Sequence, residues 1–313
     1  MANTYGKVSG TFEEIENAYG KVSGVWKEAD EIYGKVSGVW KLVFAAFQAT
    51  SLQTLSSGSG TFTVPQGANA IHIQAGVGGG GGAAGGVSYD RAGGESSGAG
   101  GGSGAFVSDK VFTVTTGETI SYAIGGGGAA GNQTANFGQP KTGSPGTNTT
   151  LSGSSVGSIF TLAAGGGASG INGGVQGPLR TNIAGTAGSA TINGTAISSG
   201  NFRDTDGTTK SVTTLTSGPV GTFNQSGNGV AGNNNGNCSG DNCQIGGSTG
   251  AASYAGNIAG GAGSPQGGST GGSAGTRGSG GGGGGAQYGN ESVTGRAEVG
   301  GAGEIQYRFL RVN

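Results

Sequence analysis

The chain has 313 residues, of which 78 are glycine, whereas about 7% glycine is usual in proteins. Its 15 basic and 16 acidic residues leave a formal charge of −1, so no net positive field is available to attract the phosphates of a nucleic acid. One histidine and two cysteines are too few for a His-based catalytic centre or a His/Cys metal site. We therefore expect a structural or binding protein with no enzyme activity, no cofactor and no metal.

Residues 1–47 contain an internal repeat. The motif Tyr-Gly-Lys-Val-Ser-Gly occurs three times at a spacing of 14 residues, and an apolar or aromatic pair follows each copy. Each copy predicts a β-hairpin, because Gly supplies the positive φ that a tight turn needs. A unit this short cannot bury its own aromatic side chain, so the repeats must stack on each other or on a partner chain. We interpret residues 1–47 as a docking module, with a small self-contained repeat domain as the alternative; the candidate contacts are Tyr5, Tyr19, Trp26, Tyr33 and Trp40.

The same region bears on membranes. Its apolar run at about 39–47 is interrupted by Lys41 and is far shorter than the ~20 residues that span a bilayer. The N-terminus has no basic stretch followed by an apolar one, which predicts that there is no secretory signal.

Residues 48–57 predict a polar linker, and residues 58–313 a second, glycine-rich domain. Alternating apolar and polar residues indicate its strands. Three of these strands run directly into glycine tracts, which indicates a β-sandwich that continues into a glycine-rich layer. The predicted strands are 60–64, 70–75, 110–114, 119–124, 158–163 and 304–312, and the tracts begin at 78, 125 and 165.

The glycine tracts have one packed solution. In the extended polyproline II geometry a chain makes no internal hydrogen bonds, so glycine chains can approach closely and bond to one another. Only many bonds formed together offset a backbone entropy cost of about 1–2 kcal/mol per residue, so such a bundle should be all-or-none. The alternative is disordered loops, and the two interpretations differ most over 226–285. The expected fold is mainly β: N-terminal β-hairpin repeats, then a β-sandwich-like glycine-rich domain with polyglycine II-type segments.

Two polar features have plain interpretations. Asp204-Thr-Asp-Gly resembles the start of a calcium loop, but Leu215 stands where the twelfth-position Glu would be, so we predict a hairpin turn. His72 alternates with Ile71 and Ile73 in a predicted strand, so we expect its side chain at the surface.

The glycine-rich domain also contains candidate binding and disulfide residues. Cys238 and Cys243 could close a small disulfide loop, or stay as free thiols during assembly in a reducing cytoplasm. Aromatic residues and their polar neighbours could stack on a sugar or fill a pocket on a host protein; the alternative is packing on their own scaffold. The candidate receptor contacts are Tyr89, Arg91, Phe202, Arg203, Tyr254 and Tyr288.

Several segments together resemble a known family. Gly60-Thr-Phe-Thr-Val-Pro-Gln-Gly67, followed by a strand and a glycine run, resembles the opening of the glycine-rich domain of bacteriophage tail fibre proteins. Residues 114–120 resemble the second element of that domain, and 301–308 its closing strand. The N-terminal repeats resemble short repeats of phage tail and virion proteins. The stretch 175–285 matches only in composition and is longer than the family's usual spacer.

The resemblance implies a receptor-binding adhesin or tail-tip protein of the virion, assembled in the host cytoplasm and released by lysis. Its implied partners are other tail or baseplate proteins, through residues 1–47, and a host surface glycan or outer-membrane protein. Virion fibres are commonly trimeric, so a homo-oligomer is implied; contact with nucleic acid and membrane insertion are not. Three rivals stay open: a purely structural baseplate or tail component, an ice-binding or matrix protein, for which the glycine spacing looks too irregular, and a polysaccharide depolymerase, for which the acids are too thinly spread.

Overall fold

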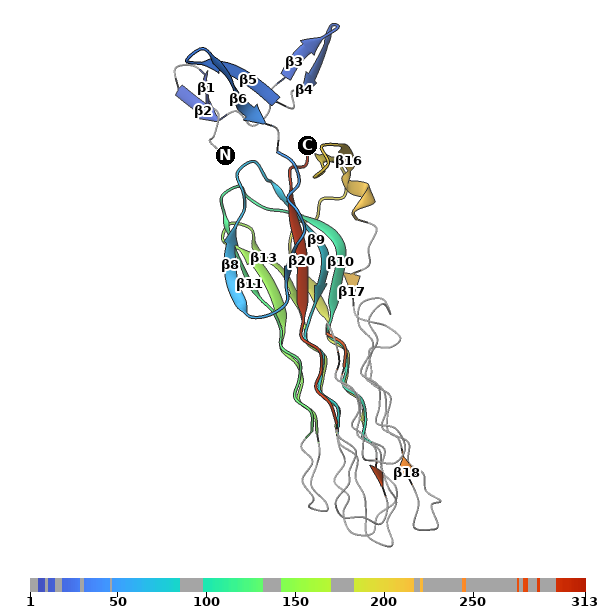
Figure 1. The fold of residues 1–313 in the computed structure, drawn as a ribbon. Helices are drawn as coiled ribbons and strands as arrows, with labels where there is room; N and C mark the ends of the chain where they lie inside the picture. The colour runs from blue at the N-terminus through green and yellow to red at the C-terminus, as the bar shows by residue number, and fades with distance from the viewer. Residues whose placement is uncertain are drawn as a thin grey trace.

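The molecule is built around a β-sandwich, with the N-terminal hairpins at one end and glycine-rich segments extending from the other (Figure 1). The computed structural model describes residues 47–84, 98–131, 142–169, 183–216, 275, 278–280 and 297–313, together with strands and turns at 5–8, 11–14, 19–28, 31–45, 220–221, 244–245 and 286–287.

Two five-stranded antiparallel sheets form the sandwich. The first has the order β17-β10-β9-β20-β7 and consists of β7 (Gln53–Leu55), β9 (Ala70–Val77), β10 (Phe106–Thr113), β17 (Val220–Gly221) and β20 (Glu304–Leu310). The second has the order β14-β13-β12-β11-β8 and consists of β8 (Ser59–Thr63), β11 (Thr119–Ala123), β12 (Thr149–Gly153), β13 (Gly157–Leu162) and β14 (Ala190–Ile192). A separate pair joins β18 (Gln244–Ile245) to β19 (Ala286–Gln287).

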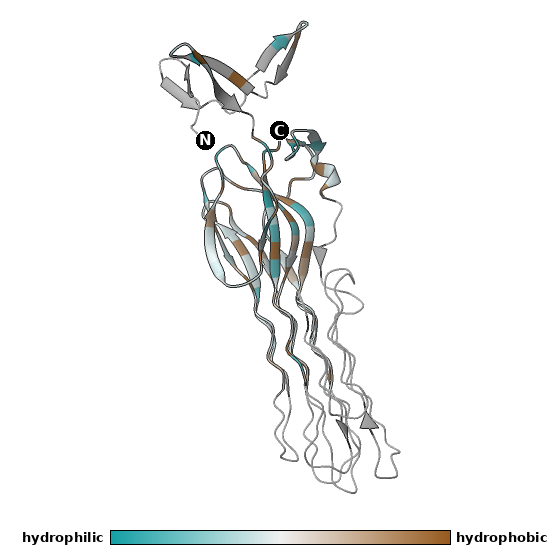
Figure 2. Cartoon of the chain, in the orientation of Figure 1, coloured by the Kyte–Doolittle hydropathy of each residue, from teal (hydrophilic) through white to brown (hydrophobic). Residues whose placement is uncertain are grey.

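The main core lies between the two sheets. Strand alternation turns Ile71 and Ile73 of β9 toward Phe160 and Leu162 of β13, and all four side chains are fully buried. Burying a side chain of this size contributes roughly 1.5–3 kcal/mol. Hydrophobic residues accordingly gather on the sandwich strands, whereas the glycine-rich segments are pale along most of their length (Figure 2).

A small insertion covers the outer face of the first sheet. It comprises the hairpin β15 (Asn201–Arg203) and β16 (Thr209–Ser211), followed by the 3-10 turn η1 (Val212–Thr214). Phe202 and Val212 of this insertion pack on Ala70, Val111 and Leu310, which point away from the main core. The first sheet is therefore covered on both faces at this end.

The structure confirms the strands predicted from alternation. The predicted strand at 304–312 becomes β20, which lies between β9 and β7 in the first sheet. Residues 48–57, expected to be a linker, differ from the prediction, because they contain β7, which pairs with β20 through Leu55 and Ile305. β7 is an edge strand with exposed polar residues, so its composition resembles that of a linker.

The predicted N-terminal hairpins are also confirmed. They are β1 (Tyr5–Val8) with β2 (Thr11–Glu14), β3 (Tyr19–Val22) with β4 (Val25–Glu28), and β5 (Glu31–Val36) with β6 (Val39–Ala45). In the second and third hairpins both turn residues have positive φ: 53° and 86° at Ser23 and Gly24, and 52° and 84° at Ser37 and Gly38. This is the type I′ turn, whose twist matches that of the strands.

Extended segments continue directly from the sandwich strands and form what we call the glycine lattice. β9, β11 and β13 lead out into three of them, and four others lead back into β10, β12, β14 and β20. Segments that leave and segments that return therefore run in opposite directions. The lattice comprises residues 78–84, 98–105, 125–131, 142–148, 163–169, 183–189, 278–280 and 297–303.

The amides of the central segment 78–84 donate to three different neighbours in rotation. The three-residue repeat is that of polyproline II geometry, and it confirms the predicted polyglycine II-type segments for the described residues. The N–H groups of Gly78, Gly81 and Ala84 bond to the carbonyls of Ala105, Gly102 and Ala99; those of Gly79 and Gly82 to Thr147 and Ser144; and those of Gly80 and Ala83 to Gly301 and Glu298, with N···O distances of 2.8–3.2 Å.

The same central segment is enclosed on every side. Its carbonyls accept from segments 125–131 and 163–169, and Gly80 packs on the backbone of Ser279. A Cβ on Gly80, Gly81 or Gly82 would overlap a backbone carbonyl of a neighbour, far inside the 3.0 Å that real Cβ atoms keep. Glycine is therefore required here because neighbouring backbones approach closely.

Candidate functional site

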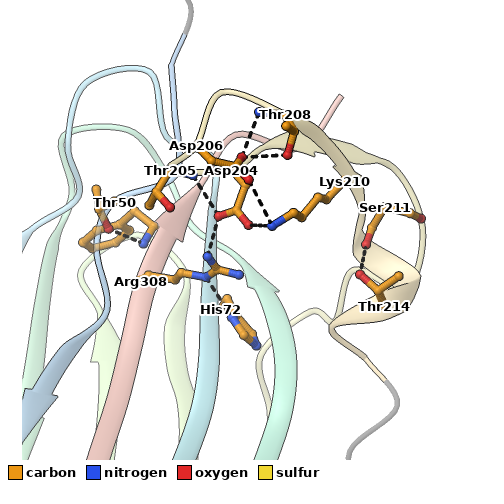
Figure 3. A network of polar contacts seen from close by, with 11 residues as sticks. Thr50, His72, Asp204, Thr205, Asp206, Thr208, Lys210, Ser211, Thr214 and Arg308 are labelled. Carbon is orange, nitrogen blue, oxygen red and sulfur yellow. Dashed lines mark hydrogen bonds and ion pairs between the residues drawn. The ribbon is translucent and has the colours of Figure 1, made fainter.

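A cluster of charged side chains lies where the insertion meets the first sheet, at the end remote from the lattice (Figure 3). Arg308 of β20 donates through Nη1 to Asp204 Oδ1 at 2.7 Å and through Nε to His72 Nδ1 at 3.3 Å. Lys210 of β16 pairs with the second Asp204 oxygen. On the other side, His72 Nε2 lies 3.5 Å from Asp109 Oδ1. We call these five residues the head network.

Hydrogen bonds beside the head network join the segment that follows the hairpins to the sandwich and the insertion. Thr50 exchanges backbone and side-chain hydrogen bonds with Phe309, at 3.0 and 2.9 Å, and the Ala49 N–H donates to the Arg203 carbonyl at 2.8 Å. Arg203 directly precedes Asp204. The insertion, β20 and residues 49–50 are thus held together at one point.

Burial and charge set the protonation states in this cluster. Burial, reinforced by the Arg308 charge, lowers the pKa of His72 to about 4, against the opposing pull of Asp109. Burial pushes the pKa of Asp204 upward, but Lys210, the Thr205 N–H and Arg308 together bring that pKa below its ordinary value. At neutral pH His72 is therefore neutral and Asp204 is ionised.

The expectation that His72 faces solvent is wrong, since it is only 2% exposed. Its side chain does point opposite to Ile71 and Ile73, but the insertion around Phe202 covers that face of the sheet. Alternation in one strand predicts on which face of the sheet a side chain lies. It cannot predict whether a segment distant in the sequence covers that face.

The buried histidine predicts an acid-sensitive stability. A histidine that is neutral when folded binds fewer protons than the unfolded chain between pH 4 and 6.5, so stability falls as the pH falls through that window. A shift of this size corresponds to about 3 kcal/mol. We expect guanidinium unfolding of the wild type to show this loss between pH 7 and 4.5, whereas His72→Gln, which keeps an acceptor for Arg308, should show a much flatter profile. Since the chain has a single histidine, equal slopes in both proteins would contradict this assignment.

The structure confirms the turn predicted at Asp204. The Asp204 N–H donates to the Thr208 carbonyl at 2.9 Å, and the Gly207 N–H to the Asp204 carbonyl at 3.0 Å. The Asp204 carboxylate is bound by Arg308 and Lys210, which occupy the side where a cation would bind. Among the described residues, no group of three or more His, Cys, Asp or Glu side chains could hold a metal ion.

The candidate docking residues lie on the N-terminal hairpins. Trp40 is 67% exposed, and the neighbouring Val39 and the equivalent Val25 are exposed too. Tyr5, Tyr19, Trp26 and Tyr33 lie on β1, β3, β4 and β5, and their side chains fall outside the described part. Exposed aromatic and aliphatic groups on two-stranded sheets are what a docking surface requires.

The candidate receptor contacts divide into two groups. Phe202 is buried in the insertion, with Arg308 5.6 Å from its ring centroid, so it is part of the scaffold and the interpretation as a receptor contact is wrong for it. Arg203 lies half-buried on β15. The other candidates lie outside the described residues: Tyr89, Arg91, Tyr254 and Tyr288, together with Cys238 and Cys243.

Contacts between the lattice segments continue to the last residues that the structure describes. Ala84 donates to the Ala99 carbonyl at 2.9 Å, and these two alanines pack with Ala168 in a small buried cluster. Segments 125–131 and 142–148 are bonded to Ala83 and Gly82, beside the same cluster. The residues that flank 85–97, 132–141 and 170–182 therefore lie close together.

Comparison with known families found a match that spans the sandwich strands and the lattice. A family model described as a glycine-rich domain matches residues 54–310, which run from β7 to the last residue of β20 and include the lattice. A search of the curated proteins found no match to the chain. Within the described residues, no helix is long and apolar enough to cross a membrane.

Proposed function

This chain belongs to the glycine-rich domain family, and we propose that it is a virion protein of a bacteriophage tail fibre or tail tip. In this proposal it attaches the particle to the host cell by binding alone, without enzyme activity. The observation that carries the proposal is the glycine lattice, a backbone-bonded frame in which the residues flanking 85–97, 132–141 and 170–182 lie close together.

The lattice suits the presentation of binding loops. Its stability comes from backbone hydrogen bonds and close glycine packing, so the sequences between its ends can vary without disturbing a side-chain core. In the proposal, residues 85–97, 132–141 and 170–182 carry the receptor contacts, with Tyr89 and Arg91 among them. Several weak contacts displayed together on a multivalent virion give useful avidity.

The other end of the molecule suits attachment to the particle. The exposed Val25, Val39 and Trp40 lie on hairpins at the opposite end of the sandwich from the lattice (Figure 1). In the proposal they dock onto another tail or baseplate protein. Residues 49–50, which follow the hairpins, are bonded to Arg203 and Phe309.

Two variants separate the two roles. We expect the purified, fluorescently labelled chain to bind host bacteria and to compete with particle adsorption. Tyr89→Ser with Arg91→Ser should reduce cell binding at least several-fold, and Val39→Ser with Trp40→Ser should leave cell binding intact but abolish incorporation into particles. Thr191→Ser on the exposed part of β14 is the matched control and should change neither.

The rival role has a distinct signature. A purely structural baseplate component would be incorporated into particles through Trp40 yet show no binding to host cells, and adsorption would be unaffected by the free chain. That combination would reject the adhesin proposal.

A further inference from the structure

Segment 142–148 forms one outer edge of the lattice, and each residue type in it has a separate task. Its sequence is Thr-Gly-Ser-Pro-Gly-Thr-Asn. Gly143 and Gly146 face the central segment, because a Cβ on either would come closer than 3.0 Å to the carbonyl oxygens of Gly82 or Gly80. The residues between these glycines are therefore free to carry side chains.

Ser144 and Thr147 each provide two acceptors. Their carbonyls accept from the central segment, and their hydroxyls accept from the adjoining segment 125–131. The Gly126 N–H donates to Thr147 Oγ1 at 2.7 Å, and the Ala129 N–H donates to Ser144 Oγ at 2.9 Å. The Thr147 and Ser144 N–H groups return bonds to the Gly126 and Ala129 carbonyls at 2.9 Å.

The remaining positions close the outer side. Pro145 is exposed and has no backbone N–H to offer another chain. Asn148 reaches to the other neighbour, where its Oδ1 accepts from the Ala164 N–H at 3.0 Å. Side chains of this segment thus accept hydrogen bonds from amides of both adjoining segments. On its outer face, Pro145 has no N–H to donate.

We propose that Ser144, Pro145 and Thr147 prevent a second copy of this chain from adding to the lattice at this edge. Amides spaced three residues apart are what hold the lattice segments to one another, so an edge with such amides unbonded would accept another glycine-rich chain. An open β-sheet edge recruits a further strand for the same reason. The most available chain with the required composition is a second copy of this protein. The proposal does not depend on what the protein binds.

The chain contains its own control segment. Residues 185–189, Gly-Thr-Ala-Gly-Ser, repeat the spacing of 143–147. Thr186 and Ser189 are exposed there, and their carbonyls bond segment 163–169. Replacing Thr186 and Ser189 therefore removes one threonine and one serine hydroxyl, as in the test variant, but from a different segment of the lattice.

The first measurement is residue-resolved amide exchange in the full chain. In Ser144→Ala with Thr147→Val, we expect the Gly126 and Ala129 amides to exchange about fivefold to tenfold faster, the effect of losing one hydrogen bond each. The Gly128 and Gly131 amides, which bond to the central segment, should keep their rates. Ser144→Thr with Thr147→Ser, which keeps both hydroxyls, should resemble the wild type, as should Thr186→Val with Ser189→Ala at these four amides.

The second measurement is sedimentation velocity over a range of protein concentrations. We expect Ser144→Ala, Pro145→Gly and Thr147→Val combined to give larger species as the concentration rises, whereas the wild type and the Thr186→Val, Ser189→Ala control keep one size. Equal acceleration of all four amides in the double variant would mean general destabilisation and would overturn the proposal. Unchanged exchange, or a triple variant that sediments as the wild type does, would overturn it as well.

Discussion

Gly81→Ala should disrupt the glycine lattice. The added Cβ would overlap the Gly166 carbonyl oxygen, and that carbonyl cannot move away freely because it accepts the Gly102 N–H. Overpacking of a rigid site costs about 1–3 kcal/mol, and each lattice hydrogen bond that is lost adds about 0.5–1.5 kcal/mol. We expect a loss of at least about 3 kcal/mol in the free energy of unfolding, measured by guanidinium denaturation.

Gly126→Ala is the matched control for this substitution. Gly126 is exposed in the same lattice, and a Cβ there would meet only Thr147 Oγ1 at an ordinary 3.7 Å. We expect a change of less than about 1 kcal/mol, with its sign set by the reduced freedom of the unfolded chain. Equal destabilisation by both substitutions would mean that glycine is needed for flexibility and not for close packing.

Asp204→Asn should produce the second large effect. The substitution keeps the shape of the side chain but removes the charge that Arg308 and Lys210 share. Asp204 is 5% exposed, whereas the side chains of Arg308 and Lys210 are 17% and 44% exposed. Leaving these two charges without their partner therefore costs about 2–3 kcal/mol, below the range for a fully buried pair. We expect that loss in global stability, together with faster proteolysis of the insertion and of residues 49–50.

Asp206→Asn tests whether this effect is specific. Asp206 lies two residues away and contacts the same Lys210 at 3.8 Å, but its side chain is 55% exposed. An exposed pair of this kind contributes little to stability, so its unfolding curve should superimpose on that of the wild type. A large effect of Asp206→Asn would show that the turn, and not the buried pair, determines stability here.

Local signals were sufficient to predict the hairpins and most sandwich strands. The Ser-Gly dipeptides at 23–24 and 37–38 specify their own turns, since a type I′ turn depends on two adjacent residues. The strands at Ile71, Ile120 and Ile305 alternate clearly, because one side of each meets the main core. Such patterns can be read without knowing the rest of the fold.

The head network could not be predicted, because it joins residues far apart in sequence. His72 and Arg308 lie on neighbouring strands, and Asp204 comes from an insertion whose docking depends on Phe202. The only available signal was the presence of Asp204 and Lys210 in a chain with few charges. The burial of Phe202 has the same origin, because the residues it packs on, Ala70, Val111 and Leu310, come from distant strands.

The sequence predicts the polyglycine II-type segments but does not predict that glycine recurs every third residue within them. The glycine spacing is irregular along the whole chain, yet within the outer segments glycine recurs every third residue, as at Gly125, Gly128 and Gly131 or at Gly185 and Gly188. The central segment 78–84 needs a small residue everywhere because it has neighbours on all sides. The period becomes visible only once the ends of each segment are known.

Native-state hydrogen exchange of the six amides from Gly79 to Ala84 tests the lattice most directly. Each donates to one of three different segments, so a cooperative lattice predicts slow exchange at all six, with one shared opening free energy that falls together as denaturant is added. Exchange at the rate of an unstructured peptide, or six unrelated opening energies, would contradict a lattice held by backbone hydrogen bonds.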